Sequence, residues 1–153
     1  MTTTPTRKND LDRVREFFRD SHYQFNETDS EYALATAFSG IAFDIRYTEP
    51  NIALVTTVAV DVVGADRFDD VLTWVEDYNN AHAFPTAVAL KDDARDVTAF
   101  GATFVLPGAW EYTDAQFADW MNSGIQGVVD AAQKFLAAFA PEALEQLRRG
   151  PSA

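Results

Sequence analysis

Residues 41–47 have the sequence IAFDIRY, in which apolar side chains alternate with small or charged ones. Successive side chains along a β-strand point to opposite faces of the sheet, so a period of two predicts a strand. One face of this strand is apolar, and the other carries Asp44 and Arg46. The segment is therefore typical of a half-buried strand in an antiparallel sheet.

The segments on either side extend this strand into an antiparallel meander. Residues 31–38 alternate with the same period and lead into the turn Ser39-Gly40. Residues 52–60 are rich in β-branched residues and apolar on both faces, as expected of a central strand that is covered on two sides. Residues 23–25 show a brief alternation, which predicts a short additional strand.

Two amphipathic helices flank the meander. Residues 10–20 and 66–80 place their apolar side chains at helical spacing. We expect Asp66 to be the N-cap of the second helix and Asn79-Asn80 to end it, because asparagine tolerates the left-handed conformation common at that position. Trp74 lies off the apolar stripe of the second helix, so we expect it to be exposed on a contact surface.

Residues 86–91 and 97–106 predict a hairpin of two strands, with Gly101 expected to mark a bulge. The elements then follow the order α-β-β-β-α-β-β-α, with a last short helix and no linker or repeat. The sequence thus predicts one α+β domain over residues 10–150, in which helices pack on an antiparallel sheet of about five strands. Residues 1–9 are polar and aperiodic, so we expect a flexible lead-in.

The last third of the chain is dominated by one long helix. Thr113 and Gln116 fit the two positions of a capping box, and apolar side chains keep helical spacing from there to residue 140. Gly124 and Gly127 lie inside this helix, where each glycine costs about 1 kcal/mol relative to alanine. We expect close packing against a neighbouring element, rather than a ligand, to offset this cost.

The composition argues against several classes of protein. The 153 residues include no cysteine, and 24 acidic against 12 basic side chains give a formal net charge of -12. Disulfides and thiolate chemistry are therefore excluded. Nucleic acid and anionic membranes bind through lysine and arginine, so we expect neither as a partner. The sequence has no apolar run long enough to span a bilayer and no signal peptide, so we expect a cytoplasmic location.

The sequence contains no catalytic or cofactor-binding motif that we recognise. The seven glycines fit neither a dinucleotide fingerprint nor a phosphate loop. His22 and His82 lie at the ends of predicted elements, and the acidic turn at residues 92–96 departs from EF-hand spacing. We therefore expect no catalytic residue, no cofactor and no metal. An enzyme is the third hypothesis, and its discriminator is whether any of His22, His82, Asp44 and Arg46 converge in a cleft.

The second helix ends in VEDYNN (residues 75–80), and the hairpin after it is followed by Leu106-Pro107 and a threonine-capped long helix. This arrangement resembles the YbjN family, described as putative bacterial sensory transduction regulators, over about residues 11–139. The resemblance implies the fold of type III secretion chaperones, which commonly dimerise, and it implies no catalytic residue. The family usually has two asparagines three residues apart in this helix; here Glu76 or Asp77 stands in place of the earlier one.

Two hypotheses follow for the function. The first is a non-enzymatic protein-interaction domain, chaperone-like or regulatory, that acts as a homodimer. Its candidate interaction residues are Trp74, Tyr78, Trp110 and Trp120, although Trp120 is also expected to lie in the core. The second is a helix-grip-like domain that binds a small molecule in an apolar cavity under the long helix. Residues 21–140 carry a net charge of -13, so we expect a protein partner with a basic or apolar surface, whose association slows as salt rises.

Overall fold

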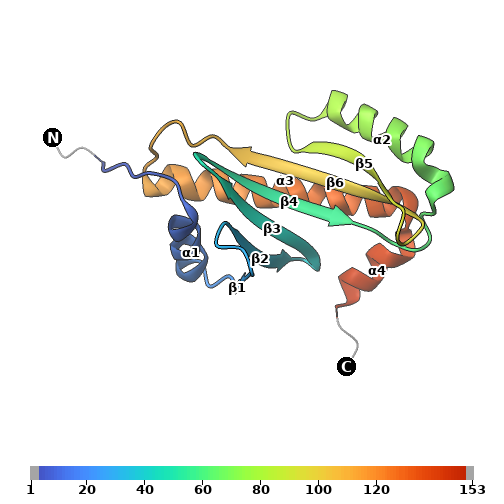
Figure 1. Cartoon of the computed structure of the whole chain (residues 1–153), viewed down its shortest axis with the longest axis horizontal. Coiled ribbons are helices and arrows are strands. Elements are labelled where there is room, and N and C mark those ends of the chain that lie inside the picture. The colour runs from blue at the N-terminus through green and yellow to red at the C-terminus, as the bar shows by residue number, and fades with distance from the viewer. Residues whose placement is uncertain (1–3, 151–153) are drawn as a thin grey trace.

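The strand β3, at Ile41–Thr48, lies inside a six-stranded antiparallel sheet (Figure 1). The computed structural model describes residues 4–150, and its strands follow the order β1-β2-β3-β4-β6-β5. The other strands are β1 (Asn26–Glu27), β2 (Ala33–Phe38), β4 (Asn51–Val58), β5 (Thr86–Asp92) and β6 (Val97–Leu106). The meander and the hairpin of the sequence analysis are thereby confirmed.

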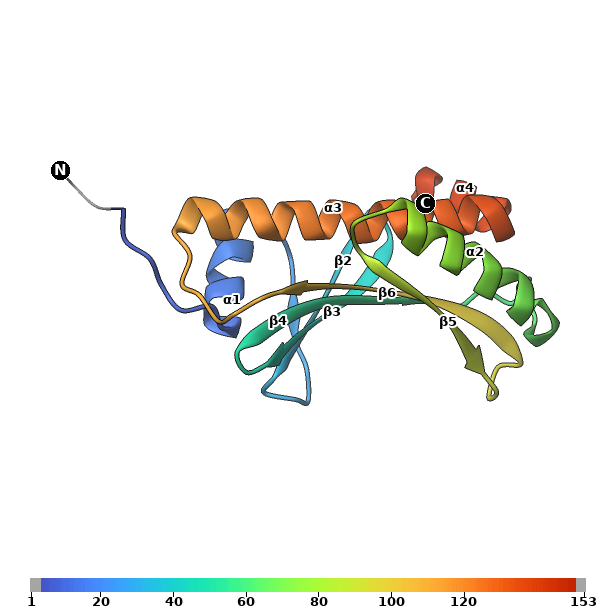
Figure 2. The ribbon, with the colours of Figure 1, turned by 90° about the horizontal axis from the view of Figure 1, so that it is seen from above.

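All the α-helices of the described residues lie on one side of the sheet (Figure 2). They are α1 (Leu11–Asp20), α2 (Phe68–Ala81), α3 (Asp114–Phe139) and α4 (Pro141–Arg149), and a 3-10 turn at Ala65–Arg67 leads into α2. α3 runs along the sheet behind β4 and β6 in the view of Figure 1. The predicted α+β class and element order are confirmed, with the two-residue β1 as a sixth strand.

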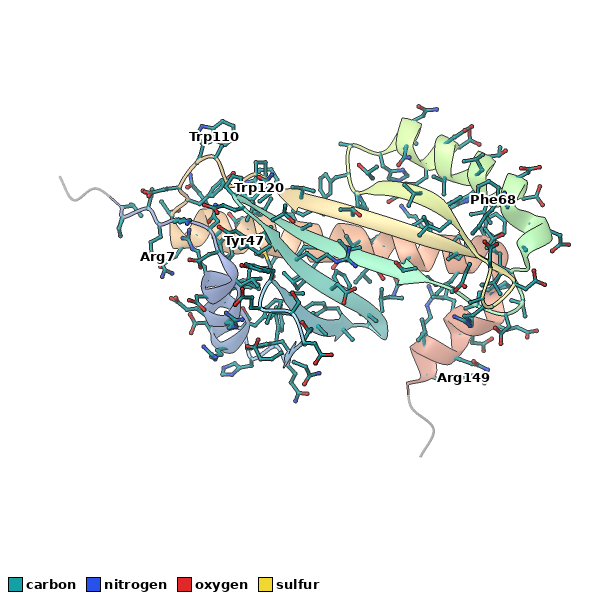
Figure 3. All side chains as sticks on the ribbon, viewed as in Figure 1. Arg7, Tyr47, Phe68, Trp110, Trp120 and Arg149 are labelled. Atoms are coloured by element: carbon teal, nitrogen blue, oxygen red, sulfur yellow. The ribbon has the colours of Figure 1, made fainter. Side chains whose placement is uncertain are left out.

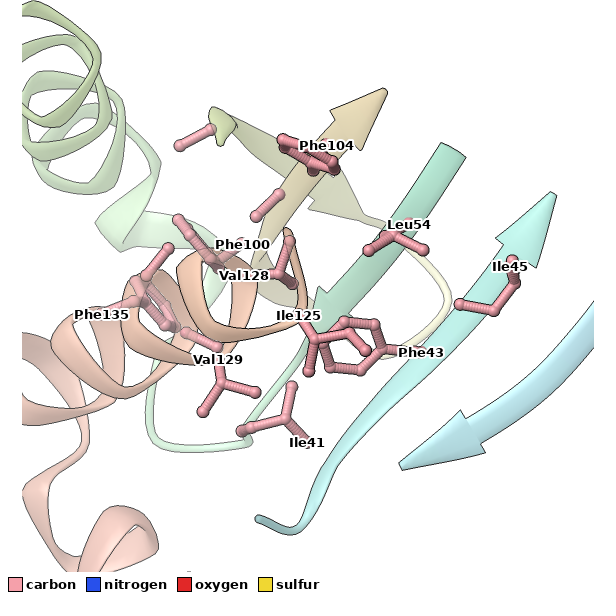
Figure 4. Close-up of a cluster of buried hydrophobic side chains, with 14 of the residues drawn as sticks. Ile41, Phe43, Ile45, Leu54, Phe100, Phe104, Ile125, Val128, Val129 and Phe135 are labelled. Atoms are coloured by element: carbon pink, nitrogen blue, oxygen red, sulfur yellow. The ribbon is translucent and has the colours of Figure 1, made fainter. Parts of the chain in front are cut away.

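The core lies between α3 and the inner face of the sheet (Figure 4). Ile125, Val128 and Val129 of α3 are buried there. The strands contribute Ile41, Phe43, Ile45, Leu54, Phe100 and Phe104, which are also buried. Each such side chain stabilises the fold by roughly 1.5–3 kcal/mol through removal of apolar surface from water. The alternation that identified residues 41–47 as a half-buried strand thus corresponds to a packed inner face.

The capping box at the start of α3 is present as predicted. Thr113 Oγ1 accepts a hydrogen bond from the Gln116 backbone N–H at 3.1 Å. The Gln116 side-chain oxygen accepts one from the Thr113 backbone N–H at 2.9 Å. Two backbone donors at the helix N-terminus are satisfied in this way, which fixes where α3 begins.

The predicted strand at residues 23–25 is wrong. β1 begins at Asn26 instead, and the rings of Tyr23 and Phe25 lie 6.2 Å and 5.7 Å from the ring of Phe18 in α1. Packing of these aromatic rings onto the helix determines the path of the backbone here. Pairing with β2 starts only after the last of them.

The predicted ends of α2 are also wrong. Asp66 lies inside the 3-10 turn, and no side chain caps that turn or the helix. The helix continues to Ala81, and Asn79 uses its amide group to bind the strand β5 instead. Asn79 Oδ1 accepts from the Ala87 N–H at 2.8 Å, and Asn79 Nδ2 donates to the Ala87 carbonyl at 2.9 Å. The side-chain amide of Asn79 thus satisfies the backbone N–H and carbonyl of Ala87. These groups would otherwise be unpaired, because β5 is an edge strand of the sheet.

Gly101 does not mark the predicted bulge. It pairs with Thr57 of β4 and with Val88 of β5 in unbroken registers. A Cβ atom at this position would lie 2.9 Å from Val88 Cγ2, closer than normal contact. The glycine therefore gives the Val88 side chain room to lie across β6.

The described part of the N-terminal segment contacts the domain. Residues 1–3 and 151–153 lie outside the described residues. Arg7 exchanges backbone hydrogen bonds with Tyr112, and Asn9 is buried with its side chain donating to the Trp110 carbonyl. Within the lead-in expected at residues 1–9, these two residues thus contact the loop before α3.

Candidate protein-interaction surfaces

The outer face of the sheet is not covered by any helix of the described residues (Figure 2). The cross-strand registers place one row of side chains from each strand on this face. The central members of these rows are Ala42, Asp44, Arg46, Ala53, Val55, Thr57, Val88, Leu90, Gly101, Thr103 and Val105, together termed the open face. Within this set only Asp44 and Arg46 are charged, and they form an ion pair at 3.4 Å.

Apolar side chains of the open face are accessible to solvent. Val88, Leu90 and Val105 are 39–46% exposed. The solvent face of an antiparallel sheet normally carries polar side chains, and contiguous exposed apolar surface marks an interaction site. The exposed Asp44–Arg46 pair contributes little to stability because water screens it. The open face is therefore the first candidate interaction surface.

Trp74 and Tyr78 pack on the helix-covered side of the domain. Their rings are stacked with centroids 5.4 Å apart. Trp74 also lies edge-on to Phe135 at 6.0 Å and to Phe139 at 6.2 Å. Trp74 is half-buried, not fully exposed as expected, because the aromatic residues of α3 pack against one side of its indole.

Tyr78 is buried and stacks on His82 with ring centroids 3.9 Å apart. Burial of the Tyr78 hydroxyl raises its pKa above the ordinary value. The ring of His82 is held by its Nδ1, which lies 2.9 Å from the Tyr78 carbonyl. These contacts account for both aromatic residues as part of the α2–α3 packing.

Trp110 and Trp120 lie at the other end of the domain, near the start of α3 (Figure 3). Trp110 is 66% exposed in the loop between β6 and α3, and Trp120 is 40% exposed. The expectation that Trp120 lies in the core is therefore wrong. Its ring is 5.7 Å from that of Phe104 and 6.4 Å from that of Tyr112, so one side packs and the other meets solvent.

The two glycines of α3 lie beside aromatic rings. A Cβ at Gly124 would overlap the ring of Phe104, and one at Gly127 would lie 2.9 Å from the ring of Phe84. Close packing, as predicted, therefore accounts for both glycines. Phe84, which precedes β5, is exposed, and the sequence analysis did not single it out. The signal that could have identified it is the second glycine, which leaves space for a ring.

Charged side chains hold the N-terminal end of α3. Arg13 is buried, and its guanidinium donates to Asp114 Oδ1 and to the Tyr112 carbonyl. Arg7 donates to Asp114 and to Glu16. Hydrogen bonds from Arg7 and Arg13 hold the pKa of the Asp114 carboxyl below its usual value, and Arg7 does the same to Glu16. The carboxylates of Asp114 and Glu16 are hydrogen-bonded to arginines of the same chain. We therefore interpret this cluster as stabilising the fold and not as a binding site.

Hollows at the surface flank α4. One of about 660 Å³ is lined by Ile41, Val58, Leu136 and Leu147, among others. Another of about 630 Å³ lies against Phe139 and neighbouring residues. The space between α3 and the sheet is filled by the core side chains (Figure 4). The hollow of about 660 Å³ is shared by Leu136 of α3 and by Ile41 and Val58 of the sheet, but it is open to solvent, whereas the helix-grip hypothesis predicts a cavity under the long helix.

The residues considered for catalysis are dispersed. Asp44 and Arg46 pair on the open face, whereas His82 stacks on Tyr78 on the helix side. None of five prominent surface hollows among residues 4–150 brings His22 or His82 together with that pair. Among residues 4–150, no three side chains of metal-ligating type gather. In the same part of the chain, no helix combines the length and apolar character needed to cross a membrane.

The fold and these surfaces define a class of protein, an α+β domain whose antiparallel sheet is covered by helices on one side only. The model of the YbjN family, described as "Putative bacterial sensory transduction regulator", matches residues 10–139. The chain belongs to this family.

A solved structure supports the same fold. It is the crystal structure of YbjN from E. coli, described as a putative transcription regulator, with a TM-score of 0.70 and 16% sequence identity. The alignment covers 81% of this chain and 89% of that one. None of the curated proteins matches the sequence.

Proposed function

We propose that this protein is a non-enzymatic interaction domain, chaperone-like or regulatory, that acts as a homodimer through its open face. The observation that carries the proposal is the uncovered sheet face, on which Val88, Leu90 and Val105 are exposed and only two residues of the central rows are charged. Membership of a family described as a sensory transduction regulator supports the regulatory role.

The size and charge of the open face favour a second copy as its occupant. The four strands that form the open face, spaced about 4.8 Å apart and each about eight residues long, present on the order of 500 Å² in projection, and side chains add to this. Specific interfaces bury upwards of roughly 600 Å² on each partner. Two sheets can pack face to face through such small apolar side chains. The single Asp44–Arg46 pair also allows self-complementary pairing across a two-fold axis.

Sedimentation equilibrium tests the proposal. We expect the full chain to be a dimer at micromolar concentration, and Val105→Glu to weaken the dimer at least about tenfold because it places a charge in the apolar contact. Ala115→Glu adds the same charge at an exposed position in the first turn of α3 and should leave the dimer intact. A monomeric wild type, or a Val105→Glu variant that dimerises normally, would contradict the proposal.

Salt dependence provides a second measurement. Each copy carries a net charge of -12, so two copies repel one another while their apolar faces attract. We expect the dimer to become tighter as salt rises, because salt screens the repulsion. Binding of a basic partner should become weaker over the same range. The two kinds of association can therefore be distinguished in one titration.

A further inference from the structure

A hollow of about 250 Å³ lies near the N-terminal end of α3, apart from the open face. It is lined by Phe84, Phe104, Asp119, Trp120 and Ser123. The three aromatic residues come from the loop before β5, from β6 and from α3. The hollow is smaller than the roughly 300–1,000 Å³ typical of pockets for drug-sized ligands, so it suits a single chemical group.

The rings of the hollow lie close to one another. The centroid of Phe104 lies 5.5 Å from that of Phe84 and 5.7 Å from that of Trp120. Phe104 is buried, whereas Phe84 is 45% exposed. Phe104 thus anchors two rings that remain accessible to a group in solution.

The two glycines of α3 create the space for this arrangement. Gly124 lies beside Phe104 and Gly127 beside Phe84, and a Cβ at either position would crowd the neighbouring ring. Close packing of a buried ring is sufficient to explain Gly124. Close packing explains Gly127 as well, but the ring that packs against it, Phe84, is substantially exposed and does not belong to the core. Its position preserves the accessible aromatic wall.

The electrostatics of the hollow select for a cation. The faces of aromatic rings are electron-rich and attract lysine ammonium and arginine guanidinium groups. Asp119 is the one charged residue of the lining, and it adds a negative charge, while the Ser123 hydroxyl supplies a hydrogen-bond acceptor. The body of the domain, residues 21–140, has a net charge of -13, which attracts cations from a distance.

We propose that this hollow binds a lysine or arginine side chain presented by a basic segment of a protein partner. The inference deepens the proposed interaction function and rests on it. Trp120 and Phe84 contact the cationic group through their ring faces, and Asp119 pairs with its charge. This site would explain how an acidic domain recognises a partner while its open face is occupied by a second copy.

Titration with a short peptide tests the proposal. The probe is the blocked peptide Gly-Gly-Arg-Gly-Gly, and its control has citrulline, the neutral isostere of arginine, in place of arginine. Two-dimensional ¹H–¹⁵N spectra of the full chain report the Trp120 indole N–H directly. We expect saturable shifts of this signal with the arginine peptide and at least about fivefold weaker binding of the citrulline peptide.

Variants then locate the site. Asp119→Asn should weaken binding of the arginine peptide about threefold or more, whereas Asp69→Asn, which changes an exposed carboxylate on α2, should leave it unchanged. Equal binding of the two peptides, an Asp119→Asn variant that binds normally, or shifts confined to Trp110 would overturn the proposal. Both variants lie at exposed positions, and the dispersion of the spectra verifies that they are folded.

The result is separable from that of the dimer experiment. Loss of peptide binding in a chain that still dimerises would reject the cation site alone. A chain that stays monomeric but binds the arginine peptide at Trp120 would reject the dimer and retain the site. The Val105→Glu variant should bind the peptide normally, since Val105 is on the opposite face of β6 from Phe104.

Discussion

The two ends of α3 are stabilised by different interactions. At the C-terminal end, Trp74 of α2 packs edge-on against Phe135 and Phe139, and α2 and α3 share one aromatic cluster. At the N-terminal end, arginine side chains hold Asp114, and Trp120 has one side in solvent. The comparison shows that an aromatic residue contributes to the fold where a second helix packs against it and is more exposed where none does.

The largest expected effect concerns the C-terminal end. Replacing Trp74 with alanine removes a ring that packs against Tyr78, Phe100 and two phenylalanines of α3, so we expect a loss of about 3 kcal/mol in the free energy of unfolding. Urea denaturation measures it. Trp110→Ala is the control, since an exposed residue should change stability by less than about 0.5 kcal/mol. If both variants lost the same free energy of unfolding, the proposed difference between the two ends of α3 would be contradicted.

Gly124→Ala should have the next largest effect. A Cβ at this position would overlap the buried ring of Phe104 and lie 2.9 Å from Leu54 Cδ1, so one of these side chains must move. Such overpacking costs typically about 1–3 kcal/mol, and the better helix propensity of alanine returns about 1 kcal/mol. We therefore expect a net loss of about 1 kcal/mol in the same denaturation experiment. If Gly124→Ala were instead more stable than the wild type, Phe104 and Leu54 would have to rearrange at little cost in free energy.

The same contrast explains what the sequence could predict. Period-two alternation in residues 41–47 identified β3 because alternation is a property of the strand itself. The capping box of Thr113 and Gln116 was predicted for the same reason, since it depends on residues only three apart. Local patterns therefore located most of the strands and helices of the fold.

The two tryptophans were assigned incorrectly because their burial depends on distant elements. Trp74 lies off the stripe of α2 but is half-buried by contacts with α3, which comes much later in the chain. Trp120 lies on the apolar side of α3 but is 40% exposed, because only one side of its ring packs against Phe104 and Tyr112. The open face was also missed: the sequence of β6 has no charged residue, which fits burial on both faces as well as an exposed interaction surface.

A smaller effect, dependent on pH, is expected at the N-terminal end of α3. The pKa of the Asp114 carboxyl is lowered by hydrogen bonds from Arg7 and then Arg13, so the ionised form stabilises the folded state. This contribution is present above the unfolded pKa, about 4, and is lost as pH falls through the lower folded value. Asp114→Asn should therefore reduce the decline in stability below about pH 4, as measured by thermal unfolding across pH. Ala115→Gln, an uncharged change at the next residue of α3, is the control and should leave the decline as it is in the wild type.

The smallest effect is expected for Gly127→Ala. A Cβ there would lie 2.9 Å from Phe84 Cε2, but this ring is exposed and can rotate into solvent. The cost of moving it should nearly cancel the gain of about 1 kcal/mol in helix propensity, so the free energy of unfolding should change by less than about 0.5 kcal/mol. Urea denaturation beside Gly124→Ala provides the matched comparison. A loss as large as that of Gly124→Ala would mean that Phe84 is held as firmly as the buried ring of Phe104.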